Sequence, residues 1–97
     1  MPFELLYTPE AFEQYEALEN DPHGAGTFKQ VKKALSYLAV NPRHKSLNTH
    51  KHYLKSIQYG FEVFEAYAQH NTPGAYRIFF YYSAKGQITI IAITPHP

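Results

Sequence analysis

The segment AYRIFFYY-SAKG-QITIIAIT, residues 75–94, consists of two β-branched and aromatic runs joined by a short turn. This pattern predicts two antiparallel strands at 75–82 and 87–94. Because side chains alternate between the faces of a strand, one face of the first run carries Arg77, Phe79 and Tyr81, and the other carries Tyr76, Ile78, Phe80 and Tyr82. A guanidinium beneath a layer of helices is costly unless it is paired. We therefore expect Arg77 on the face that helices leave open.

The residues before this segment predict a short strand and two helices. FELLY at 3–7 is typical of a strand, and Thr8, Pro9 and Glu10 then form a helix start. An apolar stripe of this first helix consists of Phe12, Tyr15 and Leu18. TFKQ at 27–30 matches a capping box for a second helix, whose stripe is Val31, Ala34, Leu35 and Leu38 and which ends before Asn41–Pro42. The two helices are expected to form a hairpin.

The segment between the second helix and residue 75 predicts two further strands. The polar run RHKSLNTHKH at 43–52 leads into YLKSIQY at 53–59, which we interpret as a possible strand, and FEVFEAYAQ at 61–69 is a clearer one. HNTPG at 70–74 has the composition of a turn. The order is β-α-α-β-β-β(-β), which predicts one α+β domain over residues 1–97, a two-layer sandwich with the helical hairpin on one face of a mainly antiparallel sheet.

Composition excludes several classes of protein. The chain has 97 residues, 44% of them hydrophobic, and no cysteine. A disulfide framework and a thiolate site are therefore excluded. No apolar run approaches the ~20 residues that span a bilayer, and the N-terminus lacks a signal-peptide pattern. We expect a cytoplasmic protein without a membrane partner.

Charge is distributed unevenly along the chain. Residues 1–28 carry six acidic and no basic residues, whereas residues 29–55 carry seven basic and no acidic residues. A long acid-free basic stretch favours a polyanionic partner such as RNA, or an acidic protein segment. The alternative is that the two stretches face each other within the fold.

The chain ends on Thr-Pro-His-Pro, residues 94–97, which places His96 between two prolines at the exit of the last strand. Proline fixes its own φ angle and restricts the residue before it, so the flanking prolines limit the conformations of His96. Either the imidazole is positioned for a function, or it belongs to a loose chain end.

The element order, NPRHKSLNTHK after the second helix, YRIFFYY on a mid-sheet strand and a histidine at the exit of the last strand together resemble the RelE/ParE toxin superfamily. The resemblance covers nearly the whole chain. It implies a toxin of a bacterial type II toxin–antitoxin system, with neighbouring first and last strands and an antitoxin partner. It also implies one of two activities: ribosome-dependent, metal-independent cleavage of mRNA, or ParE-like inhibition of DNA gyrase without nuclease activity. A toxin-like interaction protein that has lost its activity is a third possibility.

The resemblance assigns roles to individual residues. Arg77 matches the mid-sheet arginine that contacts the phosphate, and His96 stands where some nucleolytic relatives carry a catalytic histidine. Such relatives need a base for the 2′-hydroxyl, and some carry a glutamate in the loop after the second helix, where this chain has no acid. The base is therefore open between His50, Glu65 and none. The expected RNA-binding residues are Arg43, Lys45, Lys51, Tyr81 and Tyr82.

Two alternatives concern these same residues. Arg77 can instead form an ion pair with Glu62 or Glu65 across neighbouring strands and stabilise the fold. His44, His50 and His52 fit no zinc pattern with a fourth ligand, so we expect no metal or other cofactor.

Overall fold

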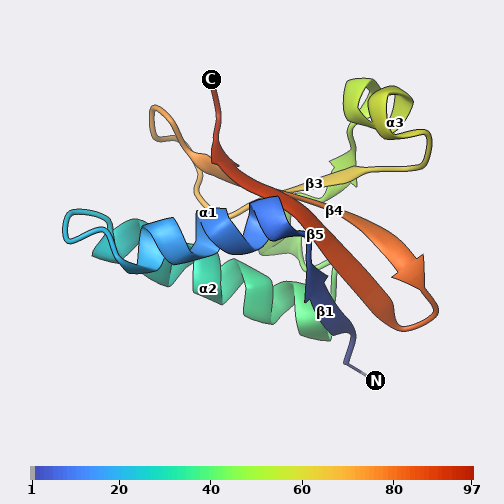
Figure 1. The fold of residues 1–97 in the computed structure, drawn as a ribbon, viewed down its shortest axis with the longest axis horizontal. Coiled ribbons are helices and arrows are strands. Elements are labelled where there is room, and N and C mark those ends of the chain that lie inside the picture. Colours follow the sequence, from blue (N-terminus) through green and yellow to red (C-terminus); the bar gives the residue numbers. More distant parts are fainter. Residues whose placement is uncertain (1) are drawn as a thin grey trace.

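The computed structural model describes residues 2–97, which include a five-stranded sheet. Figure 1 shows the helical hairpin packed on one face of this sheet. The sheet has the order β1-β5-β4-β3-β2, with β1 parallel to β5 and the other pairs antiparallel. The elements in chain order are β1 (Glu4–Tyr7), α1 (Pro9–Glu19), α2 (Ala25–Val40), the 3-10 turn η1 (Lys45–Leu47), β2 (His50–Lys51), α3 (Tyr53–Tyr59), β3 (Phe64–Tyr67), β4 (Tyr76–Ala84) and β5 (Gln87–Pro95). The predicted α+β two-layer architecture is confirmed, and so is the adjacency of the first and last strands.

The two predicted helix starts have different outcomes. At α1, the Thr8 hydroxyl accepts a hydrogen bond from the Ala11 amide at 3.1 Å, as expected of an N-cap. At α2, the predicted capping box is wrong, because the helix begins at Ala25, before Thr27, and has no side-chain cap. The side chains of Thr27 and Gln30 instead accept hydrogen bonds from the Gln69 amide nitrogen at 3.2 and 2.7 Å. They tie the end of β3 to α2.

The main core lies between the helices and the sheet. Ile78 and Phe80 of β4 are fully buried there against the predicted stripe of α2, whose members Val31, Ala34, Leu35 and Leu38 are all buried. The predicted stripe of α1 is partly wrong, since Phe12 is 53% exposed whereas Ala11 is fully buried. Ala11 and Leu18 lie seven residues apart, two helical turns, so the buried line of α1 passes through them and leaves Phe12 outside.

The opposite face of the sheet carries Arg77 and a smaller apolar cluster of Val63, Phe79, Ile91 and Ala92, with Tyr81 packed against it. The predicted alternation along β4 is thus confirmed. Figure 1 shows α3 at the far end of the molecule from α1 and α2.

The interpretation of residues 53–59 as a strand is wrong, because they form α3. Local capping decides this: the His52 ring accepts a hydrogen bond from the Lys55 amide at 3.2 Å, and Gly60 ends the helix in the left-handed region at φ 81°. Ser56 then fixes the helix to the sheet, since its hydroxyl accepts from the Val63 amide at 2.9 Å. Strand β3 is consequently shorter than the predicted 61–69.

Helix α3 leaves large apolar side chains in solvent. Tyr53, Leu54 and Ile57 are 71%, 76% and 77% exposed. Exposed apolar groups of this size on one short element are typical of contact surfaces. None of the helices described between residues 2 and 97 has the length and hydropathy needed to cross a membrane.

Candidate functional site

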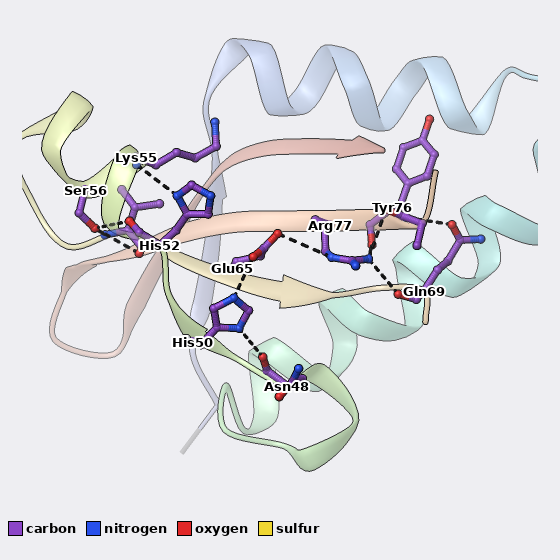
Figure 2. Close-up of polar contacts among 11 residues, drawn as sticks. Asn48, His50, His52, Lys55, Ser56, Glu65, Gln69, Tyr76 and Arg77 are labelled. Atoms are coloured by element: carbon purple, nitrogen blue, oxygen red, sulfur yellow. Dashed lines mark hydrogen bonds and ion pairs between the residues drawn. The ribbon is translucent and has the colours of Figure 1, made fainter. Parts of the chain in front are cut away.

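Arg77 lies at the centre of a polar cluster on the sheet face away from α1 and α2, as Figure 2 shows. Its Nη1 group donates to the carbonyl oxygens of Gln69 at 3.1 Å and Ala75 at 3.3 Å. The guanidinium also stacks on the Tyr67 ring at 3.7 Å from the centroid. Only 11% of the side chain is exposed, so these contacts fix the guanidinium in one orientation.

Part of the guanidinium has no hydrogen-bond partner. Nε lies 3.6 Å from Glu65 Oε2, which is an ion pair but too long for a hydrogen bond, and Nε is buried without another acceptor. Nη2 forms no hydrogen bond to any of residues 2–97. The arginine therefore retains donors for an incoming anion.

Glu65 joins Arg77 to His50. The register of β2 against β3 places His50 directly opposite Glu65, and His50 Nε2 lies 2.9 Å from Glu65 Oε1. The other ring nitrogen, Nδ1, is 2.9 Å from the Asn48 carbonyl oxygen, which can only accept. Both contacts are satisfied by an imidazolium beside a carboxylate, or by a neutral imidazole beside a carboxylic acid. In either form one proton lies between His50 Nε2 and Glu65, and a second is on Nδ1.

His96 approaches Arg77 from the other side. Its backbone amide donates at 2.8 Å to the Ala75 carbonyl, the same oxygen that accepts from Arg77 Nη1. The imidazole is exposed, and its Nδ1 lies 2.9 Å from the Pro97 carbonyl oxygen. The shared Ala75 oxygen thus brings the backbone of His96 to the guanidinium and leaves its ring at the surface.

The predicted RNA-binding residues lie in three different places. Arg43 and Lys45 are exposed in and beside η1, and Lys51 on β2 pairs with Glu62 at 3.5 Å. Tyr81 shares the face of Arg77 and packs on Phe61 at 4.3 Å between centroids. Tyr82 is on the opposite face, 6.0 Å from Phe3 and 41% exposed, because successive residues of a strand point in opposite directions. The two tyrosines cannot form one platform.

The other histidines of the 43–52 segment have structural contacts. His44 stacks on Tyr37 with centroids 4.0 Å apart and accepts from the Ser46 amide, and His52 caps α3. Across residues 2–97, no three His, Cys, Asp or Glu side chains are grouped as a metal site would require.

Sequence reasoning missed two members of the cluster. Tyr67 supplies the ring beneath Arg77, and Gln69 supplies a carbonyl for Arg77 and an amide for α2. Alternation along 61–69 puts Glu65 and Tyr67 on one face, which is the available signal. Nothing local shows that this face is the one that carries Arg77.

Comparison with known proteins supplies the fold but no close relative. No family model and no curated protein matches the sequence. Two solved structures match over the whole fold. The YoeB/ParE toxin from Agrobacterium tumefaciens has a TM-score of 0.72 and 11% identity, over 98% of this chain and 100% of that one. The YoeB dimer from Staphylococcus aureus has a TM-score of 0.70 and 14% identity, over 100% of both chains. The chain therefore has the fold of the YoeB/ParE toxins along its whole length, as its resemblance to the RelE/ParE superfamily implied.

Proposed function

We propose that this protein is the toxin of a type II toxin–antitoxin system and that it cleaves mRNA on the ribosome in the cytoplasm, without a metal ion. The fold supports the toxin assignment. One observation supports the nuclease: Arg77 lies between the His50–Glu65 pair and the Ala75 carbonyl that it shares with the His96 amide. These contacts join the Arg77 guanidinium to the His50–Glu65 pair and to the backbone of His96, and we assign the exposed His96 imidazole to the same site.

The reaction assigned to this cluster is transesterification within RNA. The 2′-oxygen forms a bond to the adjacent phosphorus, and the bond from phosphorus to the 5′-oxygen breaks, which leaves a 2′,3′-cyclic phosphate and a 5′-hydroxyl. One of the two histidines, His50 and His96, takes the proton from the 2′-hydroxyl, and the other gives a proton to the departing 5′-oxygen. The free Nη2 of Arg77 donates to the phosphate oxygens, whose negative charge grows in the transition state.

His50 is the proton-transfer group that the structure positions best. Glu65 holds Nε2, so that Nδ1 is the nitrogen available to substrate once a substrate oxygen replaces the Asn48 carbonyl. With its ring 45% exposed, His50 can reach RNA, whereas the Glu65 side chain is only 10% exposed. We assign direct proton transfer to His50, a positioning role to Glu65, and the second transfer to His96.

Basic residues of the segment that leads into β2 provide a path for the RNA backbone. Arg43 and Lys45 are exposed, and Lys51 lies next to His50 on β2. They precede the first acidic residue of this part of the chain, Glu62. The same cationic surface suits an acidic segment of the cognate antitoxin, which would then compete with the message.

The decisive assay is cleavage of a defined message on purified translating ribosomes, read by primer extension. His50→Ala, His96→Ala and Arg77→Lys should each lower the cleavage rate by about tenfold or more, because general acid–base groups contribute roughly 10²–10⁴-fold and a lysine lacks the planar guanidinium that Gln69, Ala75 and Tyr67 hold in place. Lys85→Ala, at the β4–β5 turn, is the matched control. Wild-type cleavage rates in all three site variants, each shown to be folded by circular dichroism, would refute the nuclease proposal.

A second candidate, a ParE-like inhibitor of DNA gyrase, is favoured by the apolar surface of α3 and by the small exposed fraction of Arg77. Such a toxin acts through protein contacts. Under this proposal Ile57→Glu relieves inhibition of supercoiling by purified gyrase, and His50→Ala leaves it intact. The nuclease proposal expects no effect of the wild-type protein on gyrase.

A further inference from the structure

A cavity of about 440 Å³ lies between α2, η1 and the end of β3, and it borders the Arg77 cluster at Tyr67. Its size is within the range of about 300–1,000 Å³ that is usual for small-molecule sites. We propose that this cavity binds a single nucleotide, with the base against its aromatic and apolar lining and the phosphate at Lys33.

The lining suits a flat ring. Ala34 and Leu47, which are 4% and 1% exposed, provide apolar surface, and the rings of Tyr37 and Tyr67 provide aromatic surface. Both rings are held by neighbours outside the cavity lining, Tyr37 by the stacked His44 and Tyr67 by the Arg77 guanidinium. Rings fixed in advance lose little entropy when a base packs on them, and base–aromatic stacking contributes about 1–3 kcal/mol per base.

The charge of the lining suits an anion. Lys33 is the only lysine or arginine among the residues that line the cavity, and none of them is Asp or Glu. Within residues 2–97 the Lys33 ammonium forms no ion pair, and it lies 5.8 Å from the Tyr37 centroid. A ligand that combines an aromatic ring with a phosphate satisfies both parts of the lining, whereas an apolar ring alone leaves the cation unused.

Tyr67 connects the cavity to the proposed active site. Its ring lines the cavity, carries Arg77 on its face at 3.7 Å and meets the His50 ring edge-on at 5.8 Å. A nucleotide in the cavity would therefore neighbour the phosphate that Arg77 contacts, as the adjacent residue of the same RNA strand. This last step rests on the proposed function, but binding of a free nucleotide does not.

The test is an NMR titration of the labelled protein with AMP, GMP, CMP and UMP, with the corresponding nucleosides, and with inorganic phosphate. We expect nucleotides to shift the methyl signals of Ala34, Leu47 and Ala68. Lys33→Gln should weaken nucleotide binding by about fivefold or more and leave nucleoside binding unchanged, as expected for the loss of one charged contact. Lys29→Gln, an exposed lysine one turn earlier on α2 that does not line the cavity, is the matched control.

Three results would overturn the inference: no shifts at these methyl groups, inorganic phosphate as effective as a nucleotide, or an equal loss in both lysine variants. The ribosome assay separates this inference from the proposed function. Nucleotide binding by a protein that cleaves no message would leave the cavity assignment standing and refute the nuclease. Cleavage without nucleotide binding would do the reverse.

Discussion

Replacing Glu65 with glutamine tests whether the carboxylate stabilises the fold by neutralising Arg77. The Glu65 side chain is 10% exposed and that of Arg77 is 11% exposed, so Glu65→Gln leaves a largely buried guanidinium without its counter-charge. Removing one partner of a buried pair costs about 3–5 kcal/mol. Arg77 keeps two carbonyl acceptors and the Tyr67 ring, so we expect the lower end, about 3 kcal/mol.

Urea denaturation followed by circular dichroism measures this free energy of unfolding. Glu62→Gln is the control, because the Lys51–Glu62 pair has side chains 37% and 68% exposed and such surface pairs contribute at most about 1 kcal/mol. The double variant Glu65→Gln/Arg77→Met should recover part of the lost stability, since no unpaired charge remains. Glu65→Gln within about 0.5 kcal/mol of the wild type, or strict additivity with Arg77→Met, would refute this account of the cluster.

Three further predictions follow from the helices and the core. Thr8→Ala should lower the free energy of unfolding by about 1–2 kcal/mol in urea melts, because the hydroxyl caps α1 and also donates to the Ile91 carbonyl at 2.9 Å; a change below about 0.3 kcal/mol would contradict the cap. Phe80→Ala should cost about 3–5 kcal/mol and Phe12→Ala less than about 1, since the first ring is fully buried and the second is 53% exposed; equal losses would contradict the assigned faces. Burial, and secondarily Tyr15, raises the pKa of Tyr7 above its ordinary value of 10.0. As the pH rises, the unfolded chain therefore loses the Tyr7 proton before the folded protein does, so the contribution of Tyr7 to folding stability is complete below about pH 10 and is lost as the pH rises through the folded-state pKa. Tyr7→Phe should flatten the fall in melting temperature at alkaline pH. An unchanged fall would refute this role of Tyr7.

The candidate site shows how far the sequence alone reaches. Arg77 and its face could be predicted, because alternation along 75–82 leaves two choices and a buried guanidinium excludes one. Glu65 was foreseen as one of two ion-pair partners of Arg77 and as a candidate base, but not as the residue that joins Arg77 to His50. The contacts of Tyr67 and Gln69, and the choice of Glu65 over Glu62, could not be predicted, since they depend on the register of β2, β3 and β4.

Local sequence pattern determined the 75–94 hairpin and the buried stripe of α2, which are periodic signals, and the Thr8 cap, which is a signal of adjacent residues. Predictions from local pattern were wrong where the same residues were compatible with two different structural roles. Residues 53–59 have strand-like composition, but capping by His52 and Gly60 makes them a helix, and Thr27 and Gln30 have capping-box spacing but bind Gln69 instead. Periodicity is a property of neighbours in sequence, so the chain reveals it directly. His50, Glu65 and Arg77 meet across β2, β3 and β4, and the amide of His96, just after β5, binds the Ala75 carbonyl that Arg77 also contacts. Only the tertiary structure, which sets strand order and register, decides these contacts.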